Sequence, residues 1–176
     1  MPWLQKAQAA YRTRRALRWA VDLAVVLALV AAIGAWQTRG HVRGVPLPAE
    51  ALTSLDGRTV SLQSLAGKPT VLAFWAPWCG VCKASSDNLS RAAHLLGSRA
   101  QVVSIALAYN DRGQVERYVH DGAVDYPVLL GDDALARTLN VTSFPTLYFV
   151  GADGTISGSA VGYTTTLGLL WRLLWA

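Results

Sequence analysis

The only two cysteines of this 176-residue chain, Cys79 and Cys82, are separated by two residues. Before them, residues 70–75 form a continuous apolar run that predicts a buried central strand. After them, an apolar repeat up to Leu96 predicts a helix. This order places Cys79 at a helix N-terminus, where free backbone N–H groups and the helix dipole favour a thiolate. Because the thiolate is the nucleophile of disulfide exchange, the pair predicts redox chemistry.

Other roles for the cysteine pair fit the sequence less well. A structural disulfide between them would close too short a loop to add much stability. A zinc site needs more ligands, and His41, His94 and His120 are scattered over a linker and two helices. We expect His94 and His120 to be solvated and expect no metal site. Two alternatives stay open: a Cu(I)-handling protein that uses the two thiolates, and a binding module whose disulfide is merely structural.

A second constraint is the uncharged run over residues 23–38. Extended back to Trp19, the run is long enough to span a bilayer as a helix. Trp19 and Trp36 bracket it, as aromatic residues do at the two membrane interfaces. Basic residues are more numerous before the run than after it, which keeps the N-terminus cytoplasmic. We therefore expect a basic cytoplasmic N-terminus over residues 1–18 and a single transmembrane helix over residues 19–38.

Other interpretations of this N-terminal segment compete with an uncleaved anchor. Ala32-Ile33-Gly34 offers a passable cleavage site, so a cleaved signal peptide is the main alternative. Residues 13–17 resemble a twin-arginine export signal, although Arg18 follows where an apolar residue is usual. A buried helix of a soluble protein fits the one-sided charge badly. With an anchor, the chain is a single-pass protein of a bacterial inner membrane, with a periplasmic catalytic domain.

The net charge of +5 does not indicate nucleic-acid binding. Residues 1–44 hold seven Lys and Arg against one acidic residue, Asp22, which gives +6. The remaining nine Lys and Arg and ten Asp and Glu give −1. A nucleic-acid-binding protein carries its positive charge as a patch on the fold. We therefore expect no nucleic-acid partner.

The rest of the chain predicts an α/β domain over residues 49–176, preceded by a Gly- and Pro-containing linker over residues 39–48. The turn dipeptides Asp56-Gly57 and Asp153-Gly154 each predict a β-hairpin. We expect the hairpin strands over 52–55, 59–62, 146–150 and 155–161, further strands over 101–107 and 128–130, and helices capped by Asp111 and Asp132. The final helix is expected to bury four residues spaced i, i+3, i+4 and i+7: Leu167, Leu170, Trp171 and Leu174.

Several of these segments resemble known proteins. The sequence FWAPWCGVCK, residues 74–83, looks like the active-site segment of thioredoxins. The Asp56-Gly57 hairpin and SFPT, residues 143–146, resemble the membrane-anchored TlpA/ResA-like branch. The closing GYT, residues 162–164, with its Trp/Leu-rich helix, is similar to the ends of anchored disulfide oxidoreductases linked to copper-sensitivity suppression. The resemblance covers about residues 49–176 and implies a thioredoxin fold with an N-terminal β-hairpin extension.

The resemblance also implies roles for individual residues. Cys79 would be the exposed, attacking thiol of a protein disulfide oxidoreductase, and Cys82 the shielded, resolving thiol. Pro145 matches the family's cis-proline, beside which a substrate strand binds. We therefore expect substrate contacts from Trp78, Gly80, Val81, Phe144 and Pro145. Exported proteins are the expected substrates, and a membrane thiol reductase or oxidase is the expected electron partner. No cofactor is expected besides the redox-active disulfide.

The chain departs from these families at positions that usually carry carboxylates. Ala73 stands where thioredoxins have a buried Asp, and Ser85 stands where the cytochrome-maturation branch has a Glu. We therefore expect water, or less readily Asp87, to accept the proton of Cys82. Without a negative charge beside the pair, the reduced form gains stability, so we expect a reduction potential above thioredoxin's ~−270 mV.

Overall fold

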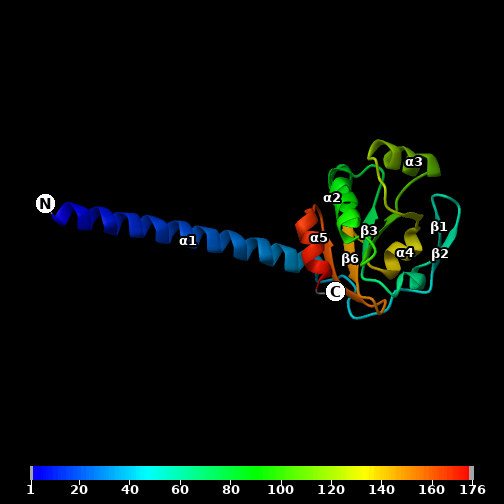
Figure 1. The fold of residues 1–176 in the computed structure, drawn as a ribbon, viewed down its shortest axis with the longest axis horizontal. Coiled ribbons are helices and arrows are strands. Elements are labelled where there is room, and N and C mark those ends of the chain that lie inside the picture. The colour runs from blue at the N-terminus through cyan, green and yellow to red at the C-terminus, as the bar shows by residue number, and fades with distance from the viewer. Residues whose placement is uncertain (1, 175–176) are drawn as a thin grey trace. The chain divides into compact units, whose positions relative to one another are not determined.

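The computed structural model describes residues 2–174, apart from the side chains of residues 2–16 and Gln37. The chain divides into two compact units, Met1–Arg39 and Gly40–Ala176. The first unit is a single helix, and the second is an α/β domain that carries both cysteines (Figure 1).

Helix α1 (Pro2–Thr38) is longer than the expected transmembrane helix, because it also includes the basic N-terminal residues. These residues include Ala, Leu, Gln and Arg, which favour helices, and a proline at the first helical position. Within α1, Leu17–Trp36 is long and apolar enough to span a membrane. The cytoplasmic location of residues 1–18 stays a prediction.

The second unit is built on a mixed seven-stranded sheet, in the order β2-β1-β5-β4-β3-β6-β7 (Figure 1). Its strands are β1 (Ala51–Ser54), β2 (Thr59–Ser61), β3 (Thr70–Trp75), β4 (Gln101–Ala106), β5 (Val128–Leu130), β6 (Thr146–Val150) and β7 (Ile156–Val161). Strands β3, β4 and β5 are parallel, and the others pair antiparallel with their neighbours. The expected N-terminal hairpin, β1–β2, extends this sheet by pairing with β5.

Helices cover both faces of the sheet. They are the 3-10 helix η1 (Leu62–Leu65), α2 (Gly80–Leu96), α3 (Arg112–Asp121), α4 (Asp133–Thr138) and α5 (Thr166–Leu173). The alternation of side chains along β3 divides the core in two. Leu72 and Phe74 pack on the face that α4 covers, and Val71 and Ala73 pack on the face that α2 and α5 cover. The α/β fold expected from the sequence is confirmed.

The segment expected to be an extended linker, residues 39–48, is largely part of the domain. The backbone N–H of Gly44 donates to the carbonyl of Ile156 at 2.8 Å, and Pro46 forms a bridge with Thr155. Leu47 is buried in the core. These contacts are made with β7 and the turn before it, far along the chain, so no local sequence pattern reveals them.

The face that α5 buries differs from the face expected for the final helix. Leu169 and Leu173 are buried. Three residues of the expected face are exposed instead: Leu167 by 78%, Trp171 by 63% and Leu174 by 78%. The sequence is ambiguous here because almost every position of the helix is apolar or small, so more than one stripe satisfies the helical spacing. The prediction of the buried face was wrong, and packing against α2 and β6 selects the face that is observed.

Candidate active site

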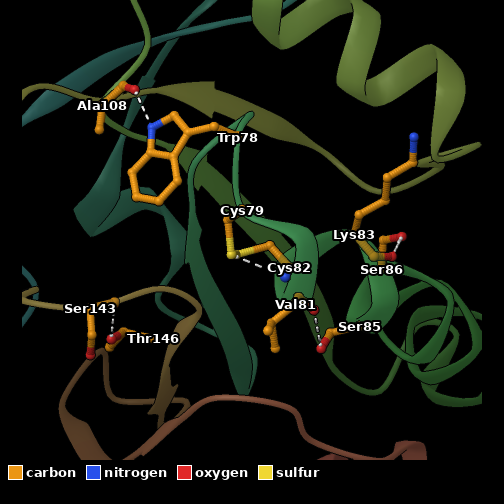
Figure 2. Close-up of a disulfide and its surroundings, with 10 residues drawn as sticks. All are labelled: Trp78, Cys79, Val81, Cys82, Lys83, Ser85, Ser86, Ala108, Ser143 and Thr146. Carbon is orange, nitrogen blue, oxygen red and sulfur yellow. Dashed lines mark hydrogen bonds between the residues drawn. A yellow bond between two sulfur atoms is a disulfide. The ribbon is translucent and has the colours of Figure 1, made fainter.

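The two cysteines form a disulfide at the N-terminus of α2 (Figure 2). Strand β3 ends at Trp75, a tight turn follows, and Cys79 is the N-cap of the helix. The backbone N–H of Cys82 donates to Sγ of Cys79 at 3.1 Å. In other helices the side chain of the N-cap residue likewise accepts a hydrogen bond from a backbone N–H of the first turn. A backbone N–H and the positive end of the helix dipole at this position favour the thiolate form of Cys79.

Both cysteines are buried in the disulfide state. Cys79 is 7% exposed and Cys82 is 3% exposed, so the expectation of an exposed Cys79 was wrong for this state. The sequence shows that Cys79 begins a helix, but it does not show that the side chain packs into a cluster with Trp75 and Ala76. Cys79 is still the more exposed of the two cysteines, as an attacking thiol should be.

Trp78 lies beside the disulfide (Figure 2). Its side chain is 69% exposed, and its indole N–H donates to the carbonyl of Ala108 at 3.0 Å (Figure 2). Its ring also meets the ring of Phe144 edge-to-face, with 5.7 Å between centroids. The left-handed backbone at Ala108, with φ of 50°, is a part of this arrangement that the sequence analysis did not find.

The five expected substrate-contact residues gather around the disulfide. Gly80 and Val81 are exposed on the first turn of α2. Phe144 lies against Trp78, and the Phe144–Pro145 peptide bond is cis. Pro145 lines the same small cavity as Cys82. The structure therefore brings these side chains together, while their contacts with a substrate stay a prediction.

The cavity beneath Cys82 has a volume of about 10 Å³, close to the space that one water molecule needs. Of the described residues that line it, none carries a carboxylate; among them are Ser85, Tyr126 and Thr164. The hydroxyl of Ser85 donates to the carbonyl of Val81 at 2.9 Å, so its proton is already used within the helix. No carboxylate therefore lines this cavity among the described residues, and transfer of the Cys82 proton to water or to Asp87 stays a prediction.

A larger groove of about 440 Å³ opens beside Trp78. It is lined by Pro77, Trp78, Lys83, Asn110, Gln114, Arg117, Tyr118 and Asp121. Tyr118 stacks on Trp75 with 3.9 Å between ring centroids, and burial raises the pKa of its hydroxyl to about 12. The phenol is therefore neutral at physiological pH. The sequence did not reveal this groove, because half of its lining residues belong to α3. No sequence motif indicates that the exposed side of this helix lies next to the active site.

Two of the three histidines, His94 and His120, lie on the surface of the domain. His94 pairs with Asp125 at 2.6 Å, and His120 lies 3.3 Å from Asp121. Both imidazoles are well exposed, as the sequence predicts. Within residues 2–174, no cluster of three or more His, Cys, Asp or Glu side chains is placed to hold a metal ion.

The known proteins that this chain resembles are thioredoxin-like proteins and thiol-disulfide oxidoreductases. The AhpC/TSA family matches residues 44–159. The chain is 35% identical to a thioredoxin-like protein of Haemophilus influenzae over 131 residues, 71% of this chain and 74% of that protein. It is 23% identical to the thiol-disulfide oxidoreductase ResA of Bacillus subtilis over 124 residues, 69% of each chain. A solved structure of a secreted Mycobacterium tuberculosis disulfide oxidoreductase, homologous to DsbE of E. coli, superposes with a TM-score of 0.64, with 29% identity, covering 73% of this chain and 96% of that chain.

Proposed function

The chain belongs to the AhpC/TSA family and is a thiol-disulfide oxidoreductase of thioredoxin-like fold, and from this premise we propose that it exchanges disulfides with exported proteins while anchored in a bacterial inner membrane. The observation that carries the proposal is the disulfide at the N-terminus of α2. Cys79 is the more accessible cysteine, and it is held against a backbone N–H that stabilises its thiolate.

The geometry supports a two-step exchange. In the reduced protein, the Cys79 thiolate attacks one sulfur of a substrate disulfide, forms a mixed disulfide and releases the other substrate sulfur as a thiolate. Cys82 loses its proton to water, and its thiolate then attacks Sγ of Cys79. This step closes the Cys79–Cys82 disulfide and releases the second substrate thiolate, so two electrons have passed to the substrate. The same steps in reverse oxidise a substrate dithiol.

The surroundings of the disulfide favour polypeptide substrates over small thiols. The groove beside Trp78 is much larger than a small thiol needs, and it combines the charged side chains of Lys83, Arg117 and Asp121 with the aromatic rings of Trp78 and Tyr118. Strand β6 begins directly after the cis-proline. An extended segment of a substrate would therefore bind beside Pro145 with its side chains toward the groove. A membrane thiol carrier would exchange electrons with the same disulfide.

Membrane anchoring is supported by the apolar segment Leu17–Trp36, and export of the domain is supported by the secreted relative. We expect the full-length chain to stay with membranes after carbonate washing. In spheroplasts, from which the outer membrane has been removed, added protease should reach residues 45–176. In sealed inside-out vesicles it should not reach them. A soluble species that begins near Ala35 would show instead that the segment is a cleaved signal peptide.

Insulin reduction separates disulfide exchange from copper handling. Catalytic amounts of the protein should accelerate the reduction of insulin by dithiothreitol, and Cys79→Ser should abolish the acceleration. Titration of the reduced protein with Cu(I) is the matched measurement. Tight binding of one Cu(I) without acceleration of insulin reduction would favour the copper-handling alternative.

A further inference from the structure

We propose that the α5 side of the domain is a docking surface for the anionic face of a lipid bilayer. The docking surface consists of Arg43, Leu167, Trp171, Arg172 and Leu174. It lies outside the disulfide site, and its ligand is the phosphate headgroup region together with the first methylenes of the lipid chains. Docking presupposes the membrane anchoring proposed above and adds a second, reversible contact to it.

Two arginines of this surface share a pocket of about 290 Å³. Nε of Arg43 donates to the carbonyl of Ser157 at 3.0 Å, and Nη1 of Arg172 donates to the carbonyl of Ser159 at 3.5 Å. Both carbonyls belong to β7, which is the last strand of the sheet. Each guanidinium has five N–H donors, so most of them remain for another acceptor.

The positive charge of this pocket meets no negative charge of the described residues, although Arg172 lies over the ring of Phe149, 5.9 Å from its centroid. Within the described part of the chain, no carboxylate lines the pocket, and neither arginine forms an ion pair. Two guanidinium groups held side by side over a pocket fit the oxygens of a phosphate, which they bind through paired hydrogen bonds. An edge strand can also be covered by charged side chains simply to prevent pairing with another chain, and the experiment below distinguishes that role.

The apolar part of the surface adjoins the arginines. Leu167, Trp171 and Leu174 are spaced i, i+4 and i+7, so they lie on one side of α5, and each is more than half exposed. Trp171 lines the pocket together with the two arginines. Large apolar side chains beside cations, with a tryptophan between them, form the composition of helices that lie in the membrane interface.

The connection to α1 supports a bilayer as the occupant. Trp36 ends the apolar segment, and only six residues separate it from Arg43. Seven residues of fully extended chain reach at most about 25 Å. If Leu17–Trp36 spans the membrane, Arg43 therefore cannot move far from the interface, and the local concentration of lipid headgroups around it is high.

Docking on this surface would leave the disulfide accessible. Arg43 contacts β7 near the first residues of the strand, next to the turn at Asp153-Gly154. The other end of β7 leads to Gly162, whose N–H donates to the carbonyl of Pro145 at 2.8 Å, beside the disulfide. Arg43 and the disulfide thus lie toward opposite ends of this strand, so contact of Arg43 with the bilayer would leave Cys79 available to exported proteins.

The test is site-specific photo-crosslinking of the full-length chain in lipid nanodiscs. The photoreactive residue p-benzoylphenylalanine replaces Leu167 in one sample and Asn110, an exposed residue beside the active-site groove, in the other. Lipid adducts are counted by mass spectrometry in discs of phosphatidylglycerol and in discs of phosphatidylcholine alone. We expect adducts at position 167 to exceed those at position 110, and to be most abundant with phosphatidylglycerol.

Charge reversal then tests the arginines. Arg43→Glu and Arg172→Glu should each lower the adduct yield at position 167 by about fivefold in phosphatidylglycerol discs. Arg137→Glu, a matched change of an exposed arginine on α4, should leave the yield unchanged. Insulin reduction in detergent should be the same for all three variants, which shows that each is folded.

Three outcomes would overturn the docking. Equal adduct yields at positions 167 and 110 would show that α5 does not face the bilayer. An unchanged adduct yield for Arg43→Glu and Arg172→Glu would show that these arginines do not bind lipid and that they only prevent β7 from pairing with another chain. Adducts to a protein instead of lipid would assign the surface to another partner.

Flotation of the discs separates the two proposals. A chain that does not float overturns anchoring and docking together, and a floating chain without adducts overturns docking alone.

Discussion

Helices α2 and α5 pack side by side on one face of the sheet, but they distribute polar and apolar side chains in opposite ways. α2 buries three polar residues: Ser85, Ser86 and Asn88. α5 exposes three large apolar ones: Leu167, Trp171 and Leu174. Both arrangements depart from the usual pattern of an amphipathic helix.

The polar residues that α2 buries are all satisfied. The hydroxyls of Ser85 and Ser86 donate to backbone carbonyls of their own helix. Asn88 binds Tyr163 through its amide nitrogen and Thr166 through its amide oxygen, at 2.9 and 3.0 Å. Polar groups can therefore lie beneath the disulfide without an unpaired donor or acceptor. The exposed apolar side chains of α5, by contrast, do not pack in the core. The reason for their apolar character must therefore be a contact on the surface of the domain.

The largest expected effect concerns the first turn of α2. Cys79→Ser removes the attacking sulfur, so exchange should fall by several orders of magnitude without trapped partners. Cys82→Ser leaves the attacker but removes the resolving sulfur, so mixed disulfides with partner proteins should accumulate. Non-reducing gels and mass spectrometry of cell extracts measure both results. Trapping by Cys79→Ser and not by Cys82→Ser would reverse the two roles.

The next largest effect separates the two faces of α5. Leu169 is 1% exposed and Leu167 is 78% exposed on the same helix. Leu169→Ala should lower the free energy of unfolding by about 2–5 kcal/mol, because it leaves a cavity in the core. Leu167→Ala, the matched control, should change it by no more than about 0.5 kcal/mol. Urea denaturation of the two variants measures the difference, and equal losses would contradict the observed orientation of α5.

Local sequence signals predicted the elements of the domain well. Asp111 and Asp132 both cap helices, accepting backbone N–H groups of Gln114 and Leu135 at 3.0 and 2.8 Å. The hairpin at Asp56-Gly57 and the strand over residues 70–75 also form as expected. In each case the residues that produce the structure are neighbours in the sequence, so the pattern contains the information needed.

Features that depend on distant segments could not be predicted in this way. The face of α5 depends on α2, the active-site groove depends on α3, and the burial of Cys79 depends on a cluster that includes Val115 and Tyr118 of α3. For the candidate site, the CxxC spacing and the proline identified the chemistry. Neither indicates how Trp78 is oriented, because its hydrogen-bond partner is the carbonyl of Ala108 in another loop.

A smaller effect is expected at the contact between the two helices. Asn88→Ala removes the partner of both Tyr163 and Thr166, so the free energy of unfolding should fall by about 1–3 kcal/mol. Tyr163→Phe removes only one of these hydrogen bonds from a half-exposed side chain and should cost about 1 kcal/mol or less. Urea denaturation measures both variants. A larger loss for Tyr163→Phe than for Asn88→Ala would show that Asn88 does not connect α2 to α5.

The smallest expected effect concerns the charge beneath α2. Ala73 is 1% exposed and lies on the face of β3 that α2 covers, where thioredoxins carry an Asp. A carboxylate there disfavours a thiolate on Cys79 by like-charge repulsion and so destabilises the reduced form. Ala73→Asp should therefore lower the reduction potential by about 30 mV, which is a tenfold change in the exchange equilibrium. The unmodified protein should remain above ~−270 mV.

The control for this prediction is Ala73→Asn, which introduces a side chain of nearly the same size without the charge. Steric disturbance of β3 affects both variants alike, whereas repulsion of the Cys79 thiolate requires the carboxylate. Equilibration with glutathione buffers, followed by counting of free thiols, measures each potential, and circular dichroism checks that both variants are folded. Equal shifts in Ala73→Asp and Ala73→Asn would rule out the electrostatic explanation. A potential of the unmodified protein at or below thioredoxin's would show that the helix N-terminus and the nearby Lys83 do not outweigh whatever stabilises the disulfide.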